Sequence, residues 1–207
     1  MMGRIRKILS SVNFRLYIVL IVLFVNALIS VAVAGNLYLN RTKVSLAKAH
    51  KGAMIVTDRG IIEIAFNKKT PMASKNFIGL TESGFYNGLR IHRIVPKVLI
   101  EMGDPLTRSD ELKSKWGNGG PGYVFSDEIF PDDVMEKGVV AMVNNGPNTN
   151  GSQFFILSED STWLNGQHTI LGWVTKGQGI VDSISSSPVS ILGIPENDIV
   201  IKEVILK

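Results

Sequence analysis

The segment Leu16–Ala34 constrains this chain most, because it is a run of 19 uncharged and mostly apolar residues. An α-helix rises 1.5 Å per residue, so a helix of this length covers the hydrocarbon core of a bilayer, about 30 Å. A helix on the surface of a globular domain would show a polar face, and this run has none. It predicts a transmembrane helix, which divides the chain into a basic tail (1–15), the membrane segment (16–34), a polar stalk (35–51) and a domain (52–207).

Two interpretations of the membrane segment stay open. An uncleaved signal anchor is favoured, because the apolar core of a cleaved signal peptide usually has ~7–15 residues. Cleavage after Ala34, which ends a small-residue pattern, would instead release a secreted protein. Four basic residues lie on each side of the run, but Arg15 abuts it whereas Arg41 lies seven residues beyond it. We therefore expect the tail in the cytosol and the domain outside it, in the secretory lumen if the source is a eukaryote.

The net charge of +4 is unevenly distributed along the chain. Residues 1–51 contain eight basic side chains and no acidic ones, whereas residues 52–207 contain 14 basic and 18 acidic ones. The domain therefore lacks the excess of positive charge that neutralises nucleic-acid phosphates. We expect no nucleic-acid partner.

The sequence gives little support for metal or cofactor chemistry. The chain has no cysteine, and its three histidines are far apart, which argues against a zinc site. Residues 117–122 match the pattern G-x-G-x-x-G, but Pro121 and the Tyr-Val-Phe that follows Gly122 indicate a loop entering a strand rather than a dinucleotide-binding turn. We expect neither a cofactor nor a metal ion.

Short runs of β-branched and other apolar residues dominate the domain, separated by turn residues. We expect strands at 53–57, 61–66, 89–95, 98–102, 139–143, 154–157, 168–175 and 199–206, and helices at 70–82 and 179–185. A long glycine-rich loop ends near Tyr123. Many short strands with only two helices predict a mainly β domain with a closed or sandwiched antiparallel sheet.

Two segments of the domain carry a family resemblance. The sequence IHRIVP (91–96) followed by Gly103-Asp104, and the sequence MVNNGPNTNGSQFFI (142–156), resemble the two signatures of cyclophilin-type peptidyl-prolyl cis-trans isomerases. WLNGQH (163–168) resembles a third segment of that family, and the similarity extends over residues 52–207. The resemblance implies a closed eight-stranded antiparallel barrel capped by two helices. It also implies an enzyme without a cofactor that acts on Pro-containing polypeptides; we expect a monomeric domain.

The resemblance also implies roles for individual residues. Arg93 would donate a hydrogen bond to the prolyl nitrogen, whose lone pair becomes localised as the amide twists. The proline would lie between Val98, Leu99, Phe155 and Leu164, with Met142 behind this pocket and His168 at its border, while Gln153, Asn144 and Trp163 would contact the peptide around it.

The chain departs from the family pattern at several of these positions. Val98 stands where the family usually has phenylalanine, Glu101 where it has glutamine, and Val143 where it has alanine. Val98 makes a shallower wall, Glu101 brings a carboxylate near Arg93, and Val143 narrows the floor beside the residue that precedes the proline. Two functions therefore stay open. One is a membrane-tethered prolyl isomerase that assists folding; the other is a weakly active or inactive module that binds Pro-containing segments.

Overall fold

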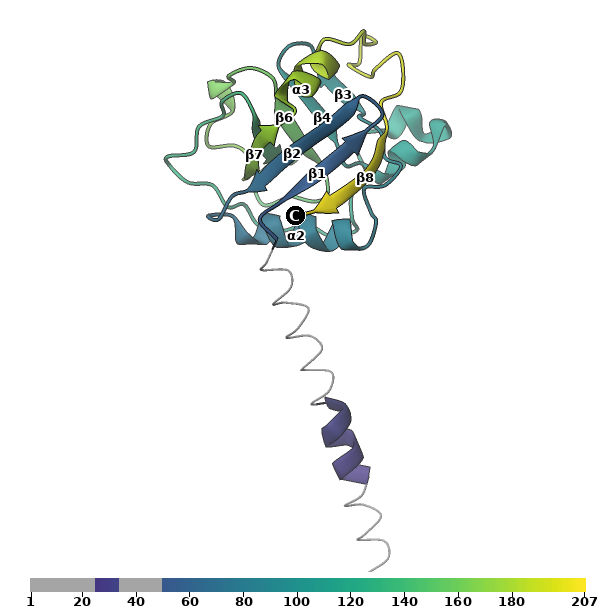
Figure 1. Ribbon diagram of the computed structural model, residues 1–207, viewed down its shortest axis with the longest axis vertical. Coiled ribbons are helices and arrows are strands. Elements are labelled where there is room, and N and C mark those ends of the chain that lie inside the picture. The colour runs from purple at the N-terminus through teal and green to yellow at the C-terminus, as the bar shows by residue number, and fades with distance from the viewer. Residues whose placement is uncertain (1–24, 34–49) are drawn as a thin grey trace, which may run out of the picture. The chain divides into compact units, whose positions relative to one another are not determined.

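The computed structural model describes residues 25–33 and 50–207 (Figure 1). Residues 25–33 form a helix. Among the residues described, no helix is both long and apolar enough to cross a membrane. The predicted tail (1–15), most of the predicted membrane segment (16–34) and nearly all of the predicted stalk (35–51) lie outside the described residues. The predictions for these parts stay predictions.

The domain is built on one antiparallel sheet. Its strands are β1 (Gly52–Thr57), β2 (Gly60–Phe66), β3 (Arg93–Val95), β4 (Leu99–Met102), β5 (Val139–Met142), β6 (Phe154–Leu157), β7 (Ile170–Lys176) and β8 (Ile201–Leu206). Their order in the sheet is β3-β4-β6-β5-β7-β2-β1-β8. The prediction of a mainly β, antiparallel domain is confirmed, and each strand falls within a predicted run or within one residue of it.

The predicted closure of the barrel needs correction. The two edge strands, β3 and β8, are not neighbours in the hydrogen-bonded order, so the sheet is a half-barrel. The segment that precedes β3 meets the start of β8: Arg90 and Val200 form an isolated bridge, and the Ile201 amide donates to the Leu89 carbonyl at 2.8 Å. Along β3 itself, the Ile94 amide donates to the Gly193 carbonyl at 2.7 Å. The edge of β3 is therefore occupied by the loop around Gly193 and not by β8.

Two α-helices cover opposite ends of the sheet (Figure 1). They are α2 (Pro71–Glu82) and α3 (Gln178–Ser185), close to the predicted helices. Helix α2 begins with proline, and its Met72 and Ala73 amides donate to the Glu128 carboxylate at 3.0 and 2.9 Å. Three short 3-10 helices, which the sequence did not predict, are η1 (Pro105–Arg108), η2 (Asp110–Lys115) and η3 (Thr162–Leu164).

Alternation along the strands produces two separate apolar clusters. Successive side chains of a strand point to opposite faces of the sheet. Ile100 and Ile156 belong to the main core inside the curved sheet. Their neighbours Leu99, Phe155 and Leu157 belong to a second cluster on the outer face. The outer face of β4, β6 and β5 is therefore apolar as well, and the candidate site lies over it.

Candidate active site

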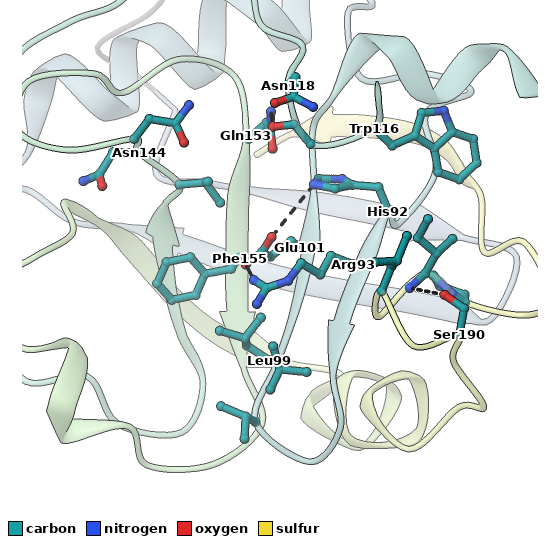
Figure 2. A pocket seen from close by; sticks show the side chains of 18 of the residues that line it. His92, Arg93, Leu99, Glu101, Trp116, Asn118, Asn144, Gln153, Phe155 and Ser190 are labelled. Atoms are coloured by element: carbon teal, nitrogen blue, oxygen red, sulfur yellow. Dashed lines mark hydrogen bonds and ion pairs between the residues drawn. The ribbon is translucent and has the colours of Figure 1, made fainter. Parts of the chain in front are cut away.

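An open groove of about 1020 Å³ crosses the outer face of the sheet over β3, β4 and β6 (Figure 2). Loops from four other parts of the chain form its rim: residues 113–118, 143–145, 163–168 and 190–196. The sheet therefore forms the floor of the groove and these loops form its rim.

The register of the strands places one row of side chains across the groove. Arg93 on β3 lies opposite Glu101 on β4, which in turn lies opposite Phe155 on β6. The next row toward the β3–β4 turn pairs Val95 with Leu99. A cation, a carboxylate and an aromatic ring therefore stand side by side on the outer face, next to aliphatic side chains.

The apolar pocket of the groove has a buried floor and a partly exposed wall. Phe155 and Leu99 are 2% and 6% exposed, and Val98 and Leu164 pack against the cluster that contains them. Val98 follows a tight turn in which its amide donates to the Val95 carbonyl at 2.9 Å. Lys97 adopts φ +60 in this turn. The pocket is lined by aliphatic and aromatic side chains, a character suited to a small aliphatic ring.

Arg93 and Glu101 form an ion pair at the edge of this pocket. Half of the Arg93 side chain is exposed, whereas the Glu101 side chain is only 12% exposed. Burial raises the pKa of Glu101, and the Arg93 charge opposes that effect. The guanidinium has several donors, so it can hold Glu101 and still present an N–H group to the groove.

His92 lies beneath the groove, next to this ion pair (Figure 2). It is 3% exposed, and its Nε2 is 3.9 Å from Glu101 Oε2. Neither ring nitrogen has a hydrogen-bond partner within 25–33 and 50–207. Burial lowers the pKa of His92 to about 4; the Asp104 carboxylate opposes this effect, and the Arg93 charge adds to it. The imidazole is therefore neutral at physiological pH.

Gln153 and Asp104 hold the glycine-rich loop against the floor of the groove. Gln153 Nε2 donates to the Gly117 and Gly119 carbonyls at 2.9 and 2.7 Å. Asp104 Oδ2 accepts from the amides of the same two glycines at 2.5 and 3.3 Å. A Cβ atom on Gly119 would lie 2.0 Å from Asp104 Oδ1, so this position excludes other residues. The G-x-G-x-x-G pattern therefore serves loop packing, and it follows a 3-10 helix and not a strand.

The opposite rim carries His168, Asn144 and Trp163. His168 Nδ1 is 3.0 Å from the Met142 carbonyl, and its ring meets the Phe155 ring edge-on at 5.1 Å. Because a carbonyl only accepts, Nδ1 carries the hydrogen and Nε2 of the neutral ring is left as an acceptor. Burial lowers the pKa of His168. Asn144 Nδ2 donates to the Gln167 carbonyl at 2.8 Å, and Trp163 is 62% exposed.

The groove brings together all but one of the residues that the sequence predicts for the site. Met142 is the exception: it is fully buried in the main core and contributes only its backbone to the site, because its strand turns the side chain inward. Sequence reasoning missed His92, Trp116, Asn118 and residues 190–196. His92 belongs to the motif IHRIVP (91–96), and its position next to Arg93 in the sequence was the signal that could have placed it in the site.

Comparison with known proteins identifies the family. The family model for cyclophilin type peptidyl-prolyl cis-trans isomerases matches residues 53–206. Human peptidyl-prolyl cis-trans isomerase-like 1 is 41% identical over 133 residues, which are 62% of this chain and 75% of that protein. Peptidyl-prolyl cis-trans isomerase B of Streptomyces anulatus is 35% identical over 175 residues, 75% of this chain and 95% of the relative.

A solved structure shows the same fold. The crystal structure of a cyclophilin type peptidyl-prolyl cis-trans isomerase from Cryptosporidium parvum has a TM-score of 0.69 and 31% identity, covering 76% of this chain and 98% of the other. A second crystal structure of that protein, in the presence of the dipeptide Ala-Pro, has a TM-score of 0.68. Together with the match over residues 53–206, these relationships show that the chain belongs to the cyclophilin-type peptidyl-prolyl cis-trans isomerase family.

Proposed function

We propose that this domain is an active peptidyl-prolyl cis-trans isomerase, which accelerates rotation about X-Pro bonds in extended polypeptides and so assists folding. The observation that carries the proposal is the Arg93 guanidinium at the edge of an apolar pocket floored by Phe155 and Leu99. A prolyl ring in this pocket would lie beside Arg93, and the guanidinium would donate to the ring nitrogen. The relative from Cryptosporidium parvum was crystallised with Ala-Pro.

The reaction asks for modest stabilisation of the transition state. An X-Pro amide rotates over a barrier near 20 kcal/mol, and uncatalysed exchange takes tens of seconds or more. Raising a rate of about 10⁻² s⁻¹ to about 10³ s⁻¹ requires roughly 7 kcal/mol. No bond is broken, so positioning and electrostatics suffice.

Arg93 supplies the electrostatic part. As the amide twists, resonance is lost and the nitrogen lone pair becomes localised, so a donor aimed at that nitrogen binds the transition state more tightly than the ground state. A guanidinium is permanently charged, so no proton has to move. Phe155 and Leu99 hold the ring while the preceding residue rotates. Asn144, Trp163 and the free Nε2 of His168 line the rim that the peptide would cross.

The ion pair between Arg93 and Glu101 favours a second candidate, a weakly active module that binds Pro-containing segments. Glu101 shares the guanidinium with the substrate, and Val143 and Val98 reshape the groove that they line. Both candidates require peptide binding, but only the first requires a faster exchange.

The test is a direct measurement of cis-trans exchange in a Pro-containing peptide by NMR. We expect the wild-type chain to accelerate exchange. Replacing Arg93 alone would leave a buried, unpaired carboxylate, so the informative pair is Glu101→Gln and the double variant Arg93→Ala/Glu101→Gln. The double variant should lose at least 100-fold in kcat/KM relative to Glu101→Gln, the scale of losing one transition-state donor. Peptide binding by the wild type without accelerated exchange would instead establish the binding module.

We also propose that residues 16–34 anchor the chain in a membrane, with the domain outside the cytosol and monomeric. The support is the length and apolarity of that run. The full chain should stay with membranes in high salt and carbonate, since a buried helix is not released by screening charges. A soluble form beginning at Gly35 would show cleavage instead. Protease accessibility in intact vesicles decides the orientation.

A further inference from the structure

The loop 188–196 carries exposed aliphatic side chains at one end of the groove. Leu192 is 73% exposed and Ile191 is fully exposed, which is unusual for adjacent large apolar residues. Leu192 and Ile194 line the groove together with Arg93, whereas Ile191 does not line it. These exposed aliphatic side chains belong neither to the proline pocket nor to the ion pair between Arg93 and Glu101.

The loop is held in a fixed shape. Val189 and Pro195 form an isolated bridge, and the Ser190 amide donates to the Ile194 carbonyl at 2.9 Å. Ser190 Oγ also accepts from the Ile194 amide at 3.2 Å, a contact visible in Figure 2. These three contacts join four residues around the tip, so Leu192 needs little further ordering to contact a ligand.

The loop is also fixed to the strand that carries Arg93. The Gly193 carbonyl accepts from the Ile94 amide at 2.7 Å. Gly193 has φ +77, and a Cβ there would lie 2.9 Å from the Ile94 carbonyl oxygen and 3.4 Å from Arg93 Cγ. The glycine allows the loop to approach the strand closely, so the loop that carries Leu192 lies directly against β3, which carries Arg93.

We propose that Leu192 and Ile194 form an apolar subsite that selects substrates with an aliphatic side chain within two residues of the proline, on the flank that crosses Arg93. The inference rests on the proposed function, since a peptide seated with its proline in the pocket extends along the groove. An extended chain advances about 3.3 Å per residue, so neighbouring side chains reach the groove rim. The substrate class is therefore unfolded polypeptide with an aliphatic residue beside proline.

The test uses the full chain and peptides that carry leucine or serine at each of the two positions before and after the proline. Exchange is measured by NMR and affinity by calorimetry. We expect wild type to prefer leucine at positions on one flank, by about fivefold in kcat/KM or affinity, the scale of a partly buried leucine. Leu192→Ser should reduce that ratio to near one. Ile191→Ser is the matched control, because Ile191 is equally apolar and adjacent but does not line the groove, and it should keep the ratio.

Each outcome decides between the alternatives. A wild type without leucine preference on either flank, or a preference that survives in Leu192→Ser, overturns the subsite. Equal loss of the leucine preference in Ile191→Ser and Leu192→Ser would assign the effect to the exposed apolar loop as a whole and also overturn the subsite. If no peptide is exchanged faster, the proposed catalysis fails, while the leucine-to-serine affinity ratio still tests the subsite.

Discussion

Arg93 and Glu101 lie directly opposite each other on the antiparallel strands β3 and β4, and their side chains form an ion pair. Directly opposed side chains in such a pair have Cβ atoms about 5 Å apart, so the contact is set by the register. Glu101 is the less exposed partner. The residue proposed to act on the prolyl nitrogen is therefore partly engaged by its own neighbour before a substrate arrives.

We expect Glu101→Gln to raise kcat/KM several-fold, a change of about 1 kcal/mol. Glutamine keeps the length and hydrogen-bonding capacity of glutamate but removes the charge. Charge-assisted hydrogen bonds are roughly twice as strong as neutral ones, so the guanidinium becomes more available. The measurement compares both proteins on neutral and on basic Pro-peptides at one pH. If wild type and Glu101→Gln have equal kcat/KM values on each peptide, Glu101 has no effect. If Glu101→Gln loses kcat/KM only on basic peptides, Glu101 selects basic substrates.

The pH dependence of turnover should follow the same carboxylate. Burial raises the pKa of Glu101, so acidification neutralises this residue sooner than an ordinary glutamate. Its protonation frees Arg93, so the advantage of Glu101→Gln over wild type should shrink as the pH falls. Because both proteins keep His92 and His168, the ratio of their kcat/KM values isolates Glu101. A ratio that stays constant down to the limit of the folded state would contradict this interpretation.

His92 should make the domain less stable in mild acid. Its pKa is lowered to about 4 by burial, against 6.5 for an ordinary histidine. Between pH 6.5 and 4 the unfolded chain therefore binds a proton that the folded chain does not. The corresponding stability is fully present above pH 6.5 and is lost as the pH falls toward 4, by about 3 kcal/mol in total.

The measurement for His92 is urea unfolding at several pH values, with His92→Gln as the comparison. The raised pKa of Glu101 has the opposite sign, because the folded state then gains stability as that carboxyl is protonated. Both proteins should therefore carry Glu101→Gln. A stability difference between them that does not change from pH 7 to pH 4 would show that the His92 imidazole binds a proton as readily in the folded state as in the unfolded state.

Local patterns predicted much of this molecule. Alternating β-branched runs and turn residues were enough for the strands, and proline at the start of α2 marked that helix. The motif 142–156 was enough to predict the family, because its residues are contiguous and can be recognised without knowledge of contacts between distant segments. The hypothesis that Glu101 can reach Arg93 agrees with the observed ion pair.

The features that were missed depend on contacts between distant segments. Residues 190–196 line the groove because Gly193 pairs with Ile94, a contact that nothing in the local sequence indicates. Because Gly193 pairs with Ile94, the loop and not β8 lies along the edge of β3, and the sheet stays a half-barrel. Met142 was placed near the pocket from its motif, but the register of β5 turns it into the main core.

The domain should fold without residues 1–49, giving a strand-dominated circular dichroism spectrum and one cooperative unfolding transition. The eight strands and both apolar clusters lie within 52–206. Lys51 adds two contacts: its amide donates to the Lys207 carbonyl at 2.8 Å, and its carbonyl accepts from the Phe66 amide at 2.9 Å. A fragment starting at His50 should therefore be more stable than one starting at Gly52, by about 1–2 kcal/mol. A mostly helical spectrum would refute the fold.

Glycine should stabilise the domain at one of two residues that share a positive φ and should not do so at the other. Lys97 and Asn148 have φ values of 60 and 61. This left-handed conformation costs an L-residue with a Cβ about 1–2 kcal/mol, whereas glycine adopts it freely. Glycine loses more backbone entropy on folding, about 0.5–1 kcal/mol, so the net gain at an otherwise neutral site is about 0.5–1 kcal/mol.

Lys97→Gly should therefore stabilise the domain by about 0.5–1 kcal/mol. The Lys97 amide, which glycine keeps, donates to the Ser185 carbonyl at 3.1 Å, and the lysine side chain makes no hydrogen bond or ion pair with the part of the chain that the structure describes. Asn148→Gly should not gain stability, because Asn148 Oδ1 accepts from the Asp127 amide at 3.0 Å and glycine removes that bond. A lost hydrogen bond of this kind costs about 1 kcal/mol. Urea unfolding of both variants at one pH provides the comparison. A destabilising Lys97→Gly would contradict this prediction and show that the lysine side chain helps to hold the turn between β3 and β4.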